Sequence, residues 1–220
     1  MPFLDGNIYL FLIVDNTKHT IMPIDNNKFS IFPKGYRNQK GQAVLATRPQ
    51  QAQDIAWAYD YITSVRAQWA TETLRSMLET ATKDELSDFK KLNFECATFN
   101  GIFSYRNARS LVTPSPFMVI DIDDLNSTEE ARKVQQALIS NDKVETALCF
   151  VSPKGRGVKW VVRLPEWAQH DDFKKSFLTM QQQVAFHYGI AIDKSGSDVC
   201  RACFLPHDPE CYINPIYFIR

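Results

Sequence analysis

The stretch FMVIDIDDL, Phe117–Leu125, joins a continuous apolar run to a cluster of acidic residues. A strand that is apolar on both faces is typical of the interior of a sheet, so this stretch predicts a central strand. Side chains two residues apart in a strand point to the same face. Asp121 and Asp123 are therefore expected to present their carboxylates side by side where the strand ends.

The residues around this strand alternate between strand and helix patterns. From Asn93 onward the predicted order is roughly β–β–α–β–β–α–β–β, which indicates an α+β fold with helices on one face of a mainly antiparallel sheet. The elements expected after the central strand are a helix at 129–140 capped by Asn126-Ser127-Thr128, strands at 147–151 and 158–164, a helix at 170–188 ended by Gly189, and strands at 190–193, 201–205 and 211–220.

The N-terminal part of the chain has a different pattern. Strands are expected at 8–14, 19–24 and 29–32, followed by the polar, basic loop Lys34–Gly41 and by a long helix at 49–81. A second helix is expected at 83–92, because Thr82 and Glu85 have the spacing of a capping box. We therefore predict a flanking lobe at residues 1–92 and a second domain at 93–220.

The composition is that of a globular protein. The 220 residues are 45% hydrophobic and 23% charged, which excludes a disordered or collagen-like chain. Lys and Arg together number 25, as do Asp and Glu, so a polybasic non-specific nucleic-acid binder is excluded while a locally basic cleft is not. The apolar run Ile8–Val14 is too short to span a bilayer and lacks the flanks of a signal peptide. We expect a cytoplasmic protein with no membrane partner.

The acidic pair at the strand end predicts a metal site. Two carboxylates so close repel each other and raise each other's pKa. A divalent cation relieves this repulsion, and Mg²⁺ takes one or two carboxylates together with substrate phosphates. In the alternative interpretation, one aspartate caps the following loop and the other is solvated.

The segment SPKGRGVK, Ser152–Lys159, predicts a phosphate-binding turn. Its two glycines allow the backbone to approach a ligand, and its three cations add positive charge. The spacing of a P-loop is missing. The alternative is an ordinary hairpin tip, in which glycine and lysine serve turn geometry and solubility.

Two further groups of residues near the C-terminus suggest sites. Asp193 would add a third carboxylate, and Arg201 would neutralise a triphosphate; the alternative is a polar loop in which an arginine pairs with Asp198. Cys200 and Cys203 form a C-x-x-C pattern that, with His207 and Cys211, has the ligand types of a zinc site. The alternating sequence around them favours small buried thiols instead.

The segments CATFNGIF, FMVIDIDDL, FVSPKGRGVKWVV and GIAIDKSGSDVCRACFLPHDPECYINP, in this order, resemble the VirE N-terminal domain family of Bacteroidetes mobile-element and phage-like proteins. That family is regarded as a branch of the archaeo-eukaryotic primase, or prim-pol, superfamily. The resemblance covers about Asn93–Pro215. It implies a two-lobed α/β module with a sheet like that of RNA-recognition domains and a site in the cleft between the lobes, here preceded by a β/helical N-terminal lobe.

The resemblance also implies roles for individual residues. Catalytic Mg²⁺ or Mn²⁺ ions would be held by Asp121, Asp123 and Asp193. The incoming nucleotide would contact Ser152, Lys154, Gly155, Gly157, Lys159 and Arg201. The sequence departs from the superfamily at Lys159, where prim-pol enzymes usually have histidine, and this puts polymerase activity in doubt.

Three hypotheses for the function follow. In the first, the protein is a primase or polymerase that transfers nucleotides from a nucleoside triphosphate along a single-stranded DNA template, which Lys34–Gly41, Arg106 and Arg109 would guide. In the second, it is a degenerate prim-pol fold that binds single-stranded DNA or a nucleotide and works with a helicase in trans. In the third, the acids are solvated and the glycine turn is only a turn.

Overall fold

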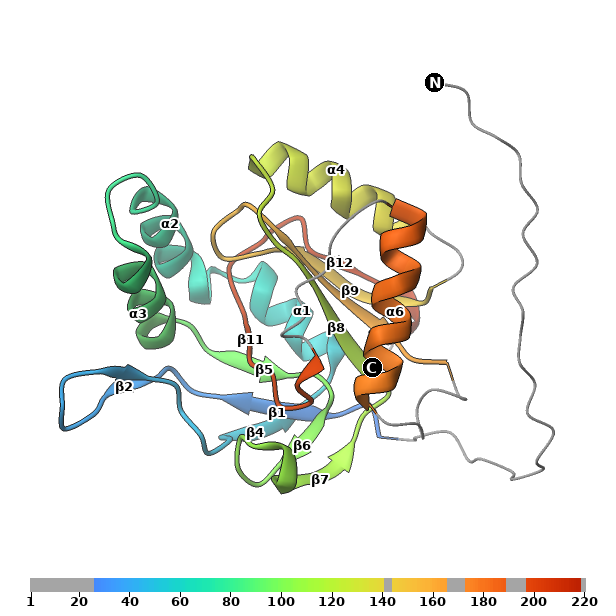
Figure 1. The fold of residues 1–220 in the computed structure, drawn as a ribbon, viewed down its shortest axis with the longest axis horizontal. Coiled ribbons are helices and arrows are strands. Elements are labelled where there is room, and N and C mark those ends of the chain that lie inside the picture. The colour runs from blue at the N-terminus through green and yellow to red at the C-terminus, as the bar shows by residue number, and fades with distance from the viewer. Residues whose placement is uncertain (1–25, 141–143, 166–172, 189–196, 219–220) are drawn as a thin grey trace.

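The computed structural model in Figure 1 describes residues 26–140, 144–165, 173–188 and 197–218. Its fold is mixed α+β, as predicted. None of the helices in these ranges is long and apolar enough to cross a membrane. The strands expected at 8–14, 19–24 and 190–193, the start of the helix expected at 170 and the glycine expected to end it lie outside the described residues, as does Asp193.

One antiparallel sheet has the strand order β12-β9-β10-β8. Its strands are β8 (Phe117–Ile122), β9 (Thr146–Val151), β10 (Val158–Arg163) and β12 (Tyr212–Ile213). The predicted hairpin of β9 and β10 is confirmed. The prediction that Phe117–Leu125 forms a central strand is wrong for the described part of the chain, because there β8 pairs only with β10.

The strand β8, at the edge of the sheet among the described residues, is apolar on both faces because other elements cover both faces of the sheet. Met118 and Ile120 of β8 pack into a core cluster with α4 (Thr128–Ile139) and α6 (Phe173–Tyr188). Phe117, on the opposite face, packs in a second cluster with α1 (Ile55–Thr63). Figure 1 shows α4 and α6 on one side of the sheet and α1 on the other. The two helices predicted after Asn93, α4 and α6, therefore lie on one face as expected, and α1 from the N-terminal segment covers the other face.

A second antiparallel sheet has the order β11-β5-β1-β4. Its strands are β1 (Phe29–Phe32), β4 (Gln51–Gln53), β5 (Cys96–Thr98) and β11 (Cys203–Phe204). Strands from before and after Leu92 meet in this sheet, where β1 pairs with β5, so the segments predicted as a lobe and a domain share one sheet and one core cluster.

Two short hairpins extend from these sheets. They are formed by β2 (Tyr36–Arg37) with β3 (Ala43–Val44), and by β6 (Gly101–Phe103) with β7 (Leu111–Pro114), which a 3-10 turn at Ala108–Ser110 precedes. The basic segment Lys34–Gly41, expected as a loop, thus contains a strand. The C-terminal strand expected to reach residue 220 is short and is followed by a 3-10 turn at Pro215–Tyr217.

The long helix expected at 49–81 is wrong. The structure has α1, a 3-10 turn at Val65–Ala67 and then α2 (Gln68–Ser76). Ser64 separates them in an extended conformation, and its hydroxyl donates to the Tyr61 carbonyl at 2.7 Å, which satisfies the end of α1 locally. Val65 and Trp69, counted in the apolar face of one helix, are 75% and 64% exposed after this break.

The helix expected at 83–92 is confirmed as α3 (Lys83–Asn93). Thr82 and Glu85 form the predicted capping box: the Thr82 hydroxyl accepts from the Glu85 amide, and the Glu85 carboxylate accepts from the Thr82 amide. Ser127 caps α4 in a similar way, as the sequence predicts, by accepting from the Glu130 amide at 3.2 Å. These local signals set where both helices begin.

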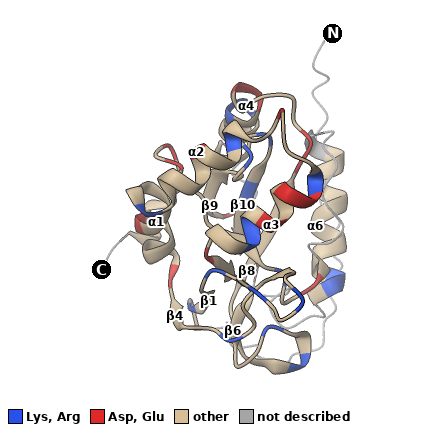
Figure 2. Cartoon of the chain, turned by 90° about the vertical axis from the view of Figure 1, so that its left-hand side faces the viewer, with Lys and Arg blue, Asp and Glu red and all other residues tan. Residues whose placement is uncertain are grey.

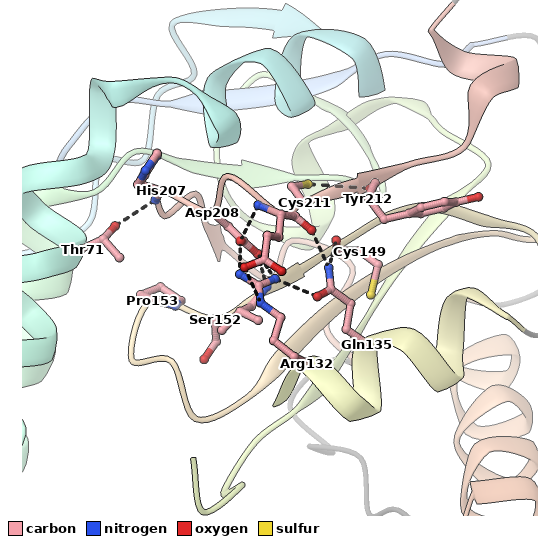
Figure 3. Close-up of polar contacts among 12 residues, drawn as sticks. Thr71, Arg132, Gln135, Cys149, Ser152, Pro153, His207, Asp208, Cys211 and Tyr212 are labelled. Carbon is pink, nitrogen blue, oxygen red and sulfur yellow. Dashed lines mark hydrogen bonds and ion pairs between the residues drawn. The ribbon is translucent and has the colours of Figure 1, made fainter. Parts of the chain in front are cut away.

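A buried ion pair joins α4 to the loop after β11. Arg132 of α4 donates two hydrogen bonds to the carboxylate of Asp208, one of them at 3.0 Å, and the Asp208 side chain is fully buried (Figure 3). The same carboxylate accepts from the backbone amides of Val151 at 2.7 Å and Glu210 at 3.1 Å. Gln135 binds Arg132 and donates to the Cys149 carbonyl at 2.8 Å. Asp208 therefore fixes α4, the end of β9 and its own loop together.

The same loop also holds the helices of the N-terminal half. The amide of His207 donates to the Thr71 hydroxyl at 2.8 Å, and its Nδ1 lies 2.8 Å from the Ser64 carbonyl (Figure 3 shows the first contact). The Asp208 amide donates to the Ile62 carbonyl at 2.9 Å. α1 and α2 are thereby attached to the sheet of β8–β10.

We predict that Asp208→Asn lowers the free energy of unfolding by about 3–5 kcal/mol, the usual cost of breaking a buried ion pair. The measurement is urea unfolding followed by circular dichroism. Glu210→Gln is the matched control, because Glu210 is 72% exposed and lies 3.7 Å from Arg132, and its effect should stay below about 1 kcal/mol. Equal effects of the two variants would contradict the central role of Asp208.

Candidate functional site

A pocket of about 1190 Å³ lies where α3, the end of β8, the β9–β10 turn and β11 meet. Figure 2 views this side of the molecule, with acidic and basic segments around α3. Among the described residues that line the pocket, eight are basic and four acidic, although the whole chain has no net charge. The basic residues are Lys83, Lys90, Lys91, Arg106, Lys154, Arg156, Lys159 and Arg201; the acidic ones are Asp121, Asp123, Asp124 and Asp198.

The two aspartates predicted as metal ligands lie together at the end of β8. Lys159 lies directly opposite Asp121 in the β8–β10 register. Its ammonium group forms an ion pair with Asp121 and lies 3.7 Å from Oδ1 of Asp123. Asp121 and Lys159 are 14% and 12% exposed, whereas Asp123 is 47% exposed and faces the pocket more openly. The structure thus brings three of the predicted site residues into contact.

This contact keeps Lys159 charged. Burial by itself lowers the pKa of a lysine, but the carboxylates of Asp121 and Asp123 outweigh it and raise the pKa of Lys159 above its ordinary value. The ammonium therefore supplies the positive charge that the two carboxylates need. The ammonium lies between carboxylate oxygens of Asp121 and Asp123, which the sequence predicts to bind a metal ion.

The predicted phosphate-binding turn forms one wall of the pocket. The Ser152 amide donates to the Gly157 carbonyl at 2.8 Å, and the Gly155 amide donates to the Ser152 carbonyl at 2.8 Å. Ser152 and Lys154 line the pocket. Gly155 has φ +76°, a left-handed conformation that glycine adopts without strain.

Gly157 is required by close packing. A Cβ at this position would lie 2.6 Å from the Ile122 carbonyl oxygen and 3.1 Å from Oδ1 of Asp123. Only glycine therefore lets the turn lie directly against the end of β8. The glycine that looked like a hairpin feature in the sequence brings the turn and the aspartates into one site.

Arg75 of α2 supports the turn from the opposite side and was not found from the sequence. Its guanidinium donates to the Pro153 carbonyl at 3.3 Å and to the Ser152 carbonyl at 3.5 Å. A Cβ on Gly155 would lie 3.3 Å from Nε of Arg75. Burial lowers the pKa of Arg75, and nearby Asp208 counteracts this effect. Arg75 belongs to no sequence motif, so no local signal pointed to it.

The remaining residues predicted for the site differ in whether the structure places them at the pocket. Arg201 lines the pocket beside Ala202 and Cys203, and its amide donates to the Asp198 carbonyl at 2.9 Å. Arg106 also lines the pocket, whereas Arg109 is not among the lining residues. Asp193 lies outside the described residues, so its meeting with Asp121 and Asp123 stays a prediction.

Lys90 of α3 is a second residue that the sequence did not single out. It lines the pocket with its ammonium group 5.7 Å from the centre of the Phe204 ring. Burial lowers the pKa of Lys90, and the positive charges of Lys154 and Lys159 lower it further. The sequence predicts that α3 belongs to a flanking lobe. The amphipathic pattern of this helix does not show which lysine faces a pocket.

The arrangement does not support the zinc alternative. Within the described ranges, no three His, Cys, Asp or Glu side chains are grouped so that they could hold a metal ion. Cys203 and Cys211 belong to the main core cluster, and Cys200 to a smaller one. Burial raises the pKa of Cys203 to about 12 and that of Cys200 to about 11, as expected for small thiols packed in apolar surroundings.

The described residues do fit part of a magnesium site. Mg²⁺ is usually bound by one or two carboxylates plus substrate phosphates. Asp121 and Asp123 supply two carboxylates that converge on one point, the Lys159 ammonium. A divalent ion bound there would require this ammonium to move aside, towards the pocket.

The fold and the pocket define a mixed α+β protein with an acidic pair facing a cationic wall. Residues 89–213 match the family model described as BT4734-like, N-terminal domain. This match covers more than half of the chain, so the protein belongs to that family. It includes α3 from Phe89 onward, both aspartates and the glycine turn. No curated protein and no solved structure matched the chain.

We predict that Lys159→Met destabilises the protein more at pH 8 than at pH 5. Without the ammonium, the two carboxylates repel each other and their pKa values rise in the folded state. At pH 5 one of them can bind a proton, whereas at pH 8 both stay charged, so the variant loses stability as the pH rises. We expect the two losses, measured by urea unfolding, to differ by about 1 kcal/mol or more, the equivalent of roughly one pKa unit.

Lys133→Met is the control, because Lys133 is exposed on α4 and is not among the residues lining the pocket. Its effect should be small and equal at the two pH values. A loss for Lys159→Met that is independent of pH would contradict the electrostatic role of Lys159.

Proposed function

We propose that the pocket binds a nucleoside triphosphate and that the protein is a primase or polymerase-like nucleotidyltransferase of a mobile genetic element. The observation that carries this proposal is the juxtaposition, in one pocket, of the Asp121–Asp123 pair with a wall of basic residues. Nucleotidyl transfer needs both features, because the metal ions require carboxylates and the triphosphate requires cations.

The sequence resemblance supports the same function. The motifs around Asp121, Ser152 and Arg201 resemble the VirE N-terminal domain family, which is regarded as a branch of the prim-pol superfamily. That superfamily uses an acidic pair on a strand for metal ions and a glycine-rich turn for the nucleotide. Both features line or shape the pocket of this protein.

The dimensions of the pocket suit a nucleotide. Ligand pockets for small molecules typically measure about 300–1,000 Å³, and a site that also admits a template strand must be larger. The volume of about 1190 Å³ meets this condition. Arg106, near the hairpin of β2 and β3, extends the basic lining towards the segment proposed to guide single-stranded DNA.

Each residue then has a proposed role. Asp121 and Asp123, with Asp193, would hold Mg²⁺ or Mn²⁺, which would activate the attacking hydroxyl and stabilise the charge on the phosphates. Lys159 would turn from the carboxylates to a phosphate oxygen. Lys154 and Arg201 would neutralise the triphosphate, and the Ser152–Gly157 turn would hold it close to the strand end.

One observation favours a second candidate function. The Lys159 ammonium contacts both carboxylates, so the site offsets part of the charge of its own acidic pair without a metal ion. A protein of this kind would bind a nucleotide or single-stranded DNA through its basic wall and perform no chemistry. A helicase acting in trans would then be the partner that uses the bound strand.

The first experiment is isothermal titration calorimetry of dGTP and GTP, with and without Mn²⁺, into the wild type and Asp123→Asn. We expect dGTP or GTP to bind more tightly with Mn²⁺ and the variant to lose this gain, because a neutral amide is a poorer metal ligand than a carboxylate. Asp84→Asn is the control, because Asp84 is exposed on α3 and outside the pocket lining.

The outcomes separate the two candidates. Binding that needs Mn²⁺ and Asp123 supports nucleotidyl transfer, and primer extension with the same variants then tests the chemistry. Binding of nucleotide or single-stranded DNA that is indifferent to Mn²⁺ and to Asp123 overturns the metal site and supports the binding module.

A further inference from the structure

One wall of the pocket is formed by α3, which precedes the sequence motifs. Lys90 is the residue of this helix whose ammonium lies over the ring of Phe204 in β11, at 5.7 Å from the ring centre. Both side chains line the pocket. A cation–π contact of this kind supports an ammonium group without neutralising its charge, so Lys90 is held at the pocket with its charge available.

Lys90 and Lys154 differ from their neighbours in their ion pairs. Lys91 binds Asp88 at 3.1 Å, Arg156 binds Glu79 at 2.7 Å, and Lys159 binds Asp121. By contrast, neither Lys90 nor Lys154 has a carboxylate of the described residues within ion-pair distance. The pocket therefore contains cations that no carboxylate of the described residues pairs with, among them Lys90 from α3 and Lys154 from the glycine turn.

Lys90 and Lys154 line the same pocket, so their like charges are brought together there. Burial disfavours the charged form of Lys90, as do the charges of Lys154 and Lys159, whereas Asp123 and Asp121 favour it, and the net effect is a lowered pKa. Bringing like charges together in a partly buried pocket costs free energy, and a bound polyanion removes that cost. A ligand with several adjacent negative charges fits this arrangement better than one with a single phosphate.

We propose that Lys90 and Lys154 form a subsite for the polyphosphate chain of the nucleotide, so that α3 supplies one side of the binding site and the glycine turn the other. This inference rests on the proposed function, because it assigns the orientation of the nucleotide in that same pocket. The phosphates would point to α3, and the α-phosphate would lie nearest to Asp121 and Asp123. The helix that looked like part of a flanking lobe would thus take part directly in binding.

The test compares dGTP, inorganic tripolyphosphate and dGMP by isothermal titration calorimetry against Lys90→Ala, Lys90→Arg and the control Lys133→Ala. A hydrogen bond to a charged group contributes about 1.5–3 kcal/mol, so Lys90→Ala should weaken dGTP and tripolyphosphate at least about tenfold. The affinity for dGMP should change less than about threefold. Lys90→Arg should keep most of the affinity, because it keeps the charge, and Lys133→Ala should match the wild type.

Two results would overturn the subsite. One is unchanged binding of dGTP and tripolyphosphate by Lys90→Ala, and the other is an equal loss for dGMP, which would mean that Lys90 acts on the fold and not on the polyphosphate. Urea unfolding of each variant identifies a loss of folding.

The subsite and the proposed function fail in different ways. If dGTP binding needs Mn²⁺ and Asp123 but not Lys90, the proposed function stands and the subsite is wrong. If tripolyphosphate binding needs Lys90 while Asp123→Asn and Mn²⁺ have no effect on dGTP, the subsite stands and metal-dependent transfer is wrong. If the wild type binds neither dGTP nor tripolyphosphate, both are wrong.

Discussion

The ion pair between Arg132 and Asp208 links the parts of the molecule that build the pocket. The Asp208 carboxylate is fully buried and binds a guanidinium from α4 and the amide at the end of β9. A buried carboxylate without these partners would cost several kcal/mol. The backbone of the same loop contacts α1, and His207 contacts α2. One loop therefore determines how the two halves of the chain are packed.

The site depends on this packing because its residues come from separate elements. Val151, whose amide binds Asp208, immediately precedes the Ser152–Gly157 turn. Arg75 of α2 donates to the first two carbonyls of that turn. Gly157 lets the turn lie against the end of β8. The turn is thus held by Asp208 through the amide of Val151, by Arg75, and by its contact with the end of β8. Its position in turn keeps Lys154 and the aspartates in one pocket.

The electrostatics of the pocket differ from those of the whole chain. The whole chain has a net charge of +0, but its acidic and basic residues are distributed unevenly, so the lining of the pocket is basic. The charge of the acidic pair is partly offset by Lys159, and basic residues of α3 and of the turn line the same pocket. Charge separation within one pocket is suited to a ligand that combines a polyanion with a metal ion. Lys159 connects the acidic and the basic parts of the site, because it contacts both aspartates and also lines the pocket.

The sequence by itself determined the local features of this protein: the hairpin of β9 and β10, the capping box of Thr82, and the closeness of Asp121 and Asp123 at the end of β8, where both contact Lys159. Each depends on residues a few positions apart or on one strand pair. Only the tertiary structure decided the rest. Arg132 and Asp208 are separated by 76 positions, and Arg75 meets its turn across 78, so no local pattern links them. The packing of whole elements likewise decides three further features. It leaves Trp69 exposed, places β8 at the edge of the sheet among the described residues, and brings Lys90 to the pocket.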